Sequence, residues 1–167
     1  MIVVGIDPGK NGGIVVINDG ENTNDSPMAE MHKCPPSAVE MSNILRRARN
    51  TAWSQQDRIV VAIEKVWAFP TDARSAAFKF GVNYGTWLGI IGCLDLAYME
   101  VPPKTWMSSY DPIPKNKKER KEYLKQTCTT MYNEMFLYKK NITYAVSDAA
   151  LIALWCLERK LNEDDRE

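Results

Sequence analysis

Two uninterrupted apolar runs near the start of the chain define its hydrophobic pattern. Residues 2–6 read IVVGI and residues 14–17 read IVVI, with the stretch PGKNGG between them at residues 8–13. Continuous Val/Ile runs bounded by Gly and Pro are typical of strands buried on both faces, and the glycines permit a tight turn. We therefore predict a β-hairpin over residues 2–17. Its first strand ends in a single acid, Asp7, whose burial must be offset by a cation or by hydrogen bonds.

The same pattern returns later in the chain. Residues 58–64 (RIVVAIE) form a second buried run, which also ends in one acid, Glu64. Further strands are predicted at residues 28–33 and 98–101. If the strands that end in Asp7 and Glu64 are parallel neighbours, their terminal carboxylates lie within a few ångströms of each other.

Four stretches have helical periodicity, at residues 37–49, from 71 or 72 to 96, 117–136 and 144–161. Ser37 followed by Glu40 has the capping-box form, which predicts the start of the first helix. We expect that helix to bury Val39, Ile44 and Leu45 and to expose Arg46, Arg47 and Arg49. In the last helix Ser147 is the predicted N-cap, and Asp148 is expected in the first turn.

Composition narrows the class of protein. The chain has 167 residues, of which 45% are hydrophobic and 25% charged, as in an ordinary globular domain, and its formal net charge is zero. Its four cysteines are widely scattered, which favours buried, reduced thiols over a zinc site or a disulfide framework. No signal peptide is visible, and the most apolar later stretch, residues 84–98, is short for a membrane span. We therefore expect a soluble, cytoplasmic protein.

Glycines recur every four residues in the second predicted helix, at Gly81, Gly85 and Gly89. Each interior glycine costs about 1 kcal/mol relative to alanine, so the spacing indicates close approach of another backbone. Two interpretations are open. The bare face packs within the monomer, or it contacts a second copy of the chain.

Three acids are candidates for chemistry: Asp7, Glu64 and Asp148. Taken singly, each has an ordinary alternative, since acids that follow strands are often turn or cap residues and Asp148 could interact with its helix dipole. Converging carboxylates repel one another and are stable together mainly when they share a hard divalent cation. Two such cations support in-line attack on a phosphodiester.

Basic and aromatic residues form a second set of candidates. Residues 115–125 hold six Lys or Arg side chains against two Glu, which is either a solvated helix face or an edge that contacts phosphate. Trp67 and Phe69 follow Glu64 in a predicted loop. Aromatic residues of this kind are either core residues or platforms on which DNA bases stack.

Three segments in this order resemble RuvC-type Holliday-junction resolvases, which belong to the RNase H-like superfamily. They are residues 5–9 (GIDPG), residues 63–64 (IE) and residues 147–153 (SDAALIA). The resemblance extends over essentially the whole chain and is greatest to phage-type members. It implies an α/β RNase H-like fold, with a mixed five-stranded central sheet flanked by helices. The nuclease domain would span residues 1–161, followed by a polar tail at 162–167.

The resemblance also implies an activity and a set of functional residues. The activity is that of a Mg²⁺-dependent endonuclease, which resolves four-way junctions and also forks and flaps by paired nicks. Asp7, Glu64 and Asp148 would hold two Mg²⁺ ions, with Mn²⁺ as a substitute, and Lys121 would neutralise developing charge. A homodimer is implied through the helix of Gly81, Gly85 and Gly89. The implied DNA contacts are Trp67, Phe69, Lys104, Lys117, Lys118 and Lys121.

One position departs from the family pattern. A fourth acid or a histidine is expected three residues before Asp148, but this chain has Ala145 there. The departure leaves open a non-catalytic domain of the same fold that binds branched DNA. Actin-like ATPases and sugar kinases also begin with a strand, an Asp and a Gly-rich hairpin, but they need two such domains and this chain is too short for both.

Overall fold

The computed structural model describes residues 1–20, 26–67, 73–136 and 142–164, and residues 161–164 are described by their backbone alone. Strands and helices follow one another in nearly the predicted order. They are β1 (Ile2–Asp7), β2 (Gly13–Asn18), β3 (Met28–Lys33), α1 (Ala38–Ser54), β4 (Ile59–Glu64), α2 (Arg74–Cys93), β5 (Ala97–Val101), α3 (Pro103–Met107), a 3₁₀ turn (Ser108–Tyr110), α4 (Lys117–Phe136) and α5 (Tyr144–Asp164).

The strands form one mixed sheet in the order β3-β2-β1-β4-β5. The predicted hairpin is confirmed, since β1 and β2 pair antiparallel and β3 adds antiparallel to β2. β4 and β5 extend the other side of β1 as parallel strands. In the β1–β4 pair Ile2 lies opposite Ile59 and Ile6 opposite Ile63, so the two strands end side by side. The two strands are therefore parallel neighbours, which was the condition for their terminal acids to lie close together.

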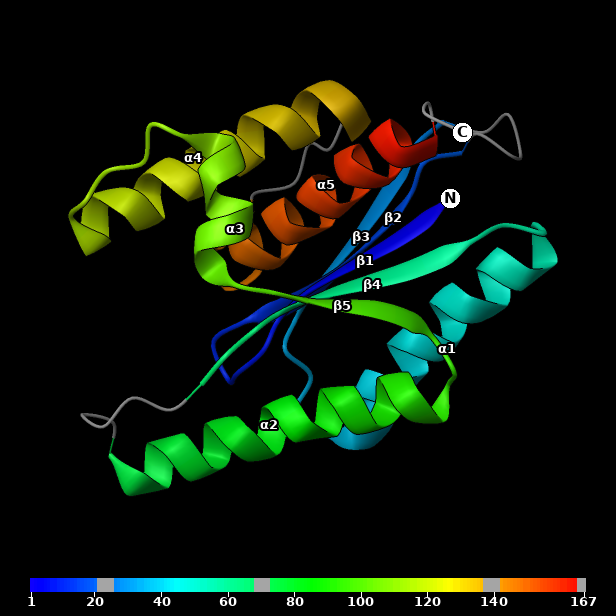
Figure 1. The fold of residues 1–167 in the computed structure, drawn as a ribbon, viewed down its shortest axis with the longest axis horizontal. Coiled ribbons are helices and arrows are strands. Elements are labelled where there is room, and N and C mark those ends of the chain that lie inside the picture. Colours follow the sequence, from blue (N-terminus) through cyan, green and yellow to red (C-terminus); the bar gives the residue numbers. More distant parts are fainter. Residues whose placement is uncertain (21–25, 68–72, 137–141, 165–167) are drawn as a thin grey trace.

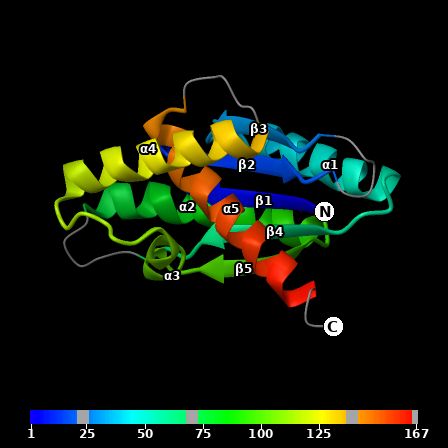
Figure 2. The same cartoon turned by 90° about the horizontal axis from the view of Figure 1, so that it is seen from above.

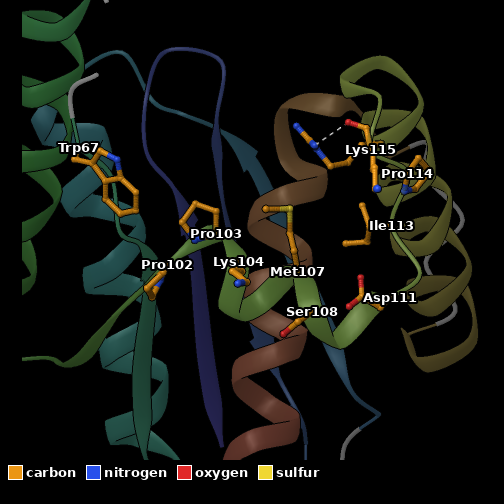
Figure 3. A pocket seen from close by; sticks show the side chains of 11 residues that line it. Trp67, Pro102, Pro103, Lys104, Met107, Ser108, Asp111, Ile113, Pro114 and Lys115 are labelled. Atoms are coloured by element: carbon orange, nitrogen blue, oxygen red, sulfur yellow. Dashed lines mark hydrogen bonds between the residues drawn. The ribbon is translucent and has the colours of Figure 1, made fainter. Parts of the chain in front are cut away.

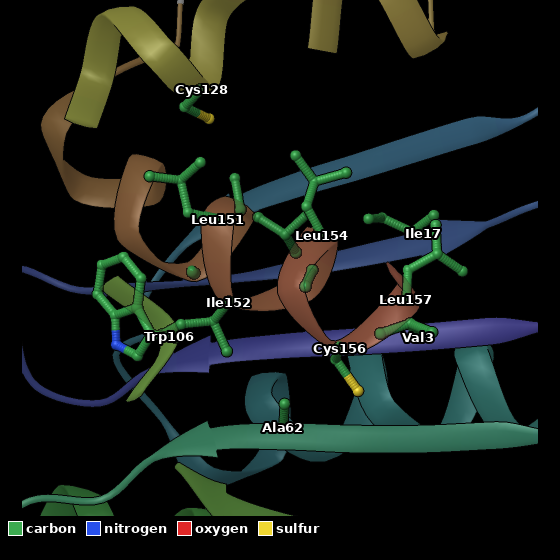
Figure 4. Packing of buried hydrophobic residues seen from close by; sticks show 14 of the residues in the cluster. Val3, Ile17, Ala62, Trp106, Cys128, Leu151, Ile152, Leu154, Cys156 and Leu157 are labelled. Carbon is green, nitrogen blue, oxygen red and sulfur yellow. The ribbon is translucent and has the colours of Figure 1, made fainter. Parts of the chain in front are cut away.

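Helices cover both faces of the sheet (Figure 1). α3, α4 and α5 lie on one face, α1 and α2 on the other, and α5 crosses the strands obliquely (Figure 2). β1 is buried along its length because its side chains alternate between two cores. Val3 points to the cluster beneath α5, where Leu151 and Leu154 pack (Figure 4). Ile2, Val4 and Ile6 point to the cluster with α1 and α2.

A glycine allows α5 to lie directly on β1. A Cβ atom at Gly5 would stand 2.2 Å from the carbonyl oxygen of Ala149 and 2.5 Å from the amide nitrogen of Ala153. Only a residue without a side chain fits between these two backbones. This close approach fixes the start of α5 beside the end of β1, and Asp148 precedes the contact by one residue.

Two predictions about helix faces are wrong. Val39 is 69% exposed rather than buried, because the buried stripe of α1 runs through Met41, Ile44 and Leu45 and Val39 lies outside it. Arg49 is half-buried rather than exposed, and its guanidinium donates to the carbonyl oxygen of Leu94 at 3.4 Å. The predicted cap at Ser37 is confirmed, since its hydroxyl accepts from the Glu40 amide at 3.2 Å.

The last helix begins earlier than its predicted cap. α5 starts at Tyr144, and the amide of Ser147 donates to the carbonyl oxygen of Thr143, so Ser147 is a buried residue inside the helix. Asp148 therefore lies in the second turn, not the first. α5 also continues past residue 161 to Asp164.

The cysteine prediction holds in part. All four thiols are free, as expected, and Cys128 and Cys156 are buried. Cys93 is exposed and Cys34 is half-buried, so burial of all four is wrong. In the described part of the chain, no helix has the length and apolar character needed to cross a membrane.

Candidate active site

Asp7 and Glu64 end the two central parallel strands at the same edge of the sheet. Asp148 reaches this point from α5, because Gly5 lets that helix lie against β1. The three carboxyl groups are near enough to act on one another electrostatically. The charges of Glu64 and Asp148 both raise the pKa of Asp7, and the charge of Asp148 raises the pKa of Glu64. The structure thus brings together the three acids that the sequence predicts.

Burial is the main cause of the raised pKa of each acid. It raises the pKa of Asp7 well above its ordinary range, with the two neighbouring carboxylates adding to the effect. Burial and the charge of Asp148 raise the pKa of Glu64 to about 7, although a hydrogen bond from Trp106 acts in the opposite direction. The pKa of Asp148 is raised by burial and partly restored by nearby cations. A site in which three carboxyl groups resist ionisation lacks compensating positive charge.

Two cations on α4 supply part of that charge. The ammonium group of Lys121 lowers the pKa of both Asp7 and Asp148, and the guanidinium of Arg120 lowers that of Asp148. Lys121 is therefore within electrostatic reach of Asp7 and Asp148. Lys117 and Lys118 are exposed one turn earlier on α4, outside this electrostatic contact and outside the groove that Figure 3 shows.

The donor set suits a hard divalent cation. Mg²⁺ and Mn²⁺ prefer carboxylate oxygens, and a cation among these acids would relieve the repulsion that raises their pKa values. Within the described residues, however, no three Asp, Glu, His or Cys side chains are drawn together closely enough to enclose an ion as they stand. The residues thus fit a divalent cation in chemistry and charge. Their side chains would still have to turn inward to hold it.

The position of the missing fourth acid lies next to the hairpin. Gly13 pairs with Asp7 across β1 and β2, and a Cβ at Gly13 would stand 2.6 Å from the carbonyl oxygen of Ala145. The first turn of α5 therefore packs on the β1–β2 turn close to Asp7. His32 does not take the place of the missing ligand, because its ring is paired with Glu30 at 2.6 Å.

A groove of about 760 Å³ lies beside the acids, between the residues that follow β4, those that follow β5, and the start of α4 (Figure 3). Trp67 and Lys104, two of the predicted DNA-binding residues, line it, and so do Lys115 and Arg120. Trp67 is 52% exposed, so it is not a core residue. Phe69, the other predicted aromatic contact, lies outside the described residues.

Sequence reasoning missed two residues of the site. Trp106 is buried, and its indole N–H donates to Oε1 of Glu64 at 2.9 Å. Its place just after β5, the strand next to β4, was the available signal. Arg120 acts on Asp148 and lines the groove, and its signal was its position next to Lys121 in the basic cluster.

The glycine face of α2 contacts no other element among the residues that the structure describes. In the described part of the chain, and apart from the neighbouring residues and nearby backbone of α2 itself, no atom lies within 4 Å of where a Cβ would stand at Gly81, Gly85 or Gly89. On the same helix Phe78 is 73% exposed and Val82 is 53% exposed. Of the two interpretations of the glycine spacing, close packing within the chain is therefore wrong.

Comparison with known proteins finds relatives by structure alone. No family model matches the sequence, and no curated protein matches it either. RuvC from Thermus thermophilus in complex with a Holliday junction substrate matches with a TM-score of 0.57 and 19% identity, covering 96% of each chain. A second structure of Thermus thermophilus RuvC gives a TM-score of 0.57 and 20% identity, covering 97% of each chain. The yeast mitochondrial Holliday junction resolvase gives 0.49 and 14%, covering 95% of this chain and 80% of that one.

Both Thermus structures match this chain over nearly its full length. The sheet of this chain is mixed and five-stranded, as the sequence resemblance implied. The chain therefore has the RNase H-like fold of RuvC.

Proposed function

We propose that this protein is a divalent-metal-dependent endonuclease that resolves four-way DNA junctions by paired nicks. The observation that carries the proposal is the meeting of Asp7, Glu64 and Asp148 at one edge of a RuvC-like sheet, with Lys121 beside them. Acids that are buried close together lower the stability of the fold. Binding of a cation by these acids would explain why the protein has them. Forks and flaps are proposed as further substrates on the family resemblance alone.

The residues of the site have separate tasks in this proposal. Asp7, Glu64 and Asp148 hold the cations, and the indole of Trp106 fixes the orientation of the Glu64 carboxylate. When bound, Mg²⁺ or Mn²⁺ supplies charge stabilisation at the phosphate and lowers the pKa of a water molecule. Lys121 stands where its ammonium group can offset negative charge that develops on the phosphate.

The groove beside the acids is the proposed path of one DNA strand. Lys104 and Arg120 offer charge to the phosphates, and the exposed indole of Trp67 offers a face for an unpaired base. A four-way junction has unpaired or strained bases at its centre, which a continuous duplex lacks. This groove therefore favours a branched substrate over a plain duplex.

A homodimer completes the proposal, because paired nicks require two active sites. The face of α2 formed by Gly81, Gly85 and Gly89, together with exposed Phe78 and Val82, is open on the described chain. Small residues at four-residue spacing allow two helices to approach closely. We propose that this face is the dimer contact.

The test is cleavage of a labelled four-way junction, a flap and a plain duplex, in Mg²⁺ and in EDTA. Wild-type protein should give paired nicks in the junction only with the metal. Asp7→Asn, which keeps the size of the side chain but removes its charge, should abolish cleavage and still bind the junction. Asp95→Asn is the matched control, because Asp95 is exposed after α2 and its positive φ of 52° suits asparagine.

Each alternative has its own outcome in this test. Junction binding without cutting in Mg²⁺ or Mn²⁺ would support the non-catalytic DNA-binding domain, which the alanine at position 145 leaves open. ATP turnover without DNA cleavage would support the kinase-like class. Normal cleavage by Asp7→Asn would show that the acids are not the catalytic site.

A further inference from the structure

A second groove lies at the same edge of the sheet, on the other side of the acids from Trp67. Its volume is about 630 Å³. The elements that form it are the β1–β2 turn, the segment after β3 and one side of α2. The lining residues are Lys10, Cys34, Pro35, Pro36, Ala76, Lys79, Phe80 and Asn83.

The order of the strands fixes where this groove lies. Across the sheet edge, the ends of β3 and of the β1–β2 turn come first, then Asp7 and Glu64, and then the residues that follow β4 and β5. The second groove occupies the first of these places, and the groove of Trp67 and Lys104 occupies the last. The carboxylates therefore stand between two grooves.

Hydrogen bonds and packing hold the walls of the second groove together. The side-chain oxygen of Asn83 accepts from the amide of Gly9 at 2.7 Å, and its Nδ2 donates to Sγ of Cys34 at 3.3 Å. The amide of Cys34 in turn donates to the carbonyl oxygen of Gly12 at 2.9 Å. Gly9 has a φ of +115°, and a Cβ there would stand 2.7 Å from the ring of Phe80. α2, the hairpin turn and the end of β3 are thus joined in one fixed wall.

The charge of this groove is positive. Lys10 and Lys79 are both exposed, one on the hairpin turn and one on α2. Among the described residues that line the groove, none is acidic. Lys10 comes only three residues after Asp7, so its charge lies close to the acids along the chain.

We propose that this groove binds the phosphate backbone of the DNA on the side of the scissile phosphate opposite the Trp67 groove. The inference rests on the proposed nuclease function and extends it to residues that the sequence did not indicate. DNA carries one negative charge per roughly 1.7 Å of duplex, so phosphates on both sides of the cut approach the three carboxylates. Cations on one side only would leave half of that repulsion uncompensated. Lys10 and Lys79 supply the positive charge that offsets this repulsion on the second side.

The experiment compares Lys10→Gln/Lys79→Gln with wild type in binding a labelled four-way junction in EDTA, where no cutting occurs. Fluorescence anisotropy at 50, 100 and 200 mM salt gives the slope of log Kd against log salt. Each lost phosphate contact lowers that slope by roughly 0.9. The double variant should therefore lose roughly 1.8 from the slope, and wild type should weaken roughly 12-fold more than the variant between 50 and 200 mM salt.

Two further variants separate charge from structure. Arg58→Gln/Arg159→Gln removes the same charge from two exposed residues, one just before β4 and one on α5 over the ring of Trp155, and should keep the wild-type slope. Lys10→Arg/Lys79→Arg keeps the charge in the groove and should also keep the slope. Single-turnover cleavage in Mg²⁺ should show a raised half-saturating concentration for the Gln variant and an unchanged maximal rate.

The outcomes distinguish this inference from the proposed function. If wild type binds and cuts the junction while the Gln variant keeps the wild-type slope, the groove does not hold phosphate and the inference is wrong. If the control pair lowers the slope as much as the Gln variant does, the effect belongs to overall charge and the inference is also wrong. If wild type neither binds nor cuts branched DNA, the proposed function itself fails.

Discussion

Glu64 offers the sharpest test of the electrostatics of the site. Its folded pKa is about 7, against an ordinary value of 4.5, because burial and the charge of Asp148 oppose its ionisation. The folded state therefore holds a proton that the unfolded state releases between these two pH values. Without a divalent cation, the free energy of unfolding should fall as the pH rises from 4.5 through 7. At 1.36 kcal/mol for each tenfold change, the loss is roughly 3 kcal/mol.

The substitution Glu64→Gln isolates this effect. Glutamine keeps the size of the side chain and an oxygen that can accept from the indole of Trp106, but it carries no charge. In EDTA the variant should match wild type at pH 4.5 and exceed its unfolding free energy by up to roughly 3 kcal/mol at pH 8. In a chain of this length that difference raises Tm by roughly 6–12 °C.

Urea and thermal denaturation, followed by circular dichroism from pH 4.5 to 8 in EDTA, measure the difference. Glu134→Gln is the matched control, because it makes the same chemical change at an exposed carboxylate on α4. Added Mg²⁺ should stabilise wild type at pH 8 more than it stabilises Glu64→Gln. A Glu64→Gln protein no more stable than wild type at pH 8 in EDTA would refute the description of Glu64 as a buried anion among other acids.

Three further substitutions test the fold, the dimer and the metal site. Gly5→Ala would place a Cβ 2.2 Å from the backbone oxygen of Ala149, so urea denaturation should show a loss of about 3 kcal/mol or more; a neutral effect would contradict the close approach of α5. Gly85→Glu should give a folded monomer in sedimentation equilibrium while Gly85→Ala stays dimeric, and a dimeric Glu variant would exclude the α2 face as the contact. Ala145→Asp should lower the Mg²⁺ concentration at half-maximal cleavage, and an unchanged requirement would show that this position does not face the cations.

Much of the fold could be predicted because the informative residues are local and periodic. β1 and β4 pack on both faces, so each is apolar except for the acid at its end. That acid therefore indicates both where the strand ends and where the candidate site lies. The glycines of α2 were ambiguous for a physical reason. Their spacing shows that a helix face is bare, but only the surrounding atoms show whether the same chain covers it.

The errors have physical causes that sequence does not express. Val39 is apolar and near a helix start, but burial depends on the direction of the helix face, which Met41 and Leu45 set. The helical pattern placed the start of α5 correctly at Tyr144, but the cap was predicted at Ser147 because serine is a good cap. The backbone of Thr143 instead accepts the first hydrogen bonds of the helix. Asn83 acts by contacts across the fold and has no signature in its own neighbourhood of the sequence. For Trp106, which donates to Glu64 across the fold, the place just after β5 was the one local signal.

The alanine at position 145 fits the charge balance of the site. The charges of Glu64 and Asp148 already raise the pKa of Asp7, and the charge of Asp148 raises that of Glu64. The charges of Lys121 and Arg120 and the hydrogen bonds from Trp106 and Ser147 act against this effect. A fourth carboxylate on the first turn of α5, which packs beside Asp7 through Gly13, would add repulsion before any cation arrives. Alanine therefore lowers the cost of folding without metal and leaves fewer protein ligands for the cations. The phosphate oxygens of bound DNA would have to complete the coordination, so we expect DNA and metal to bind cooperatively.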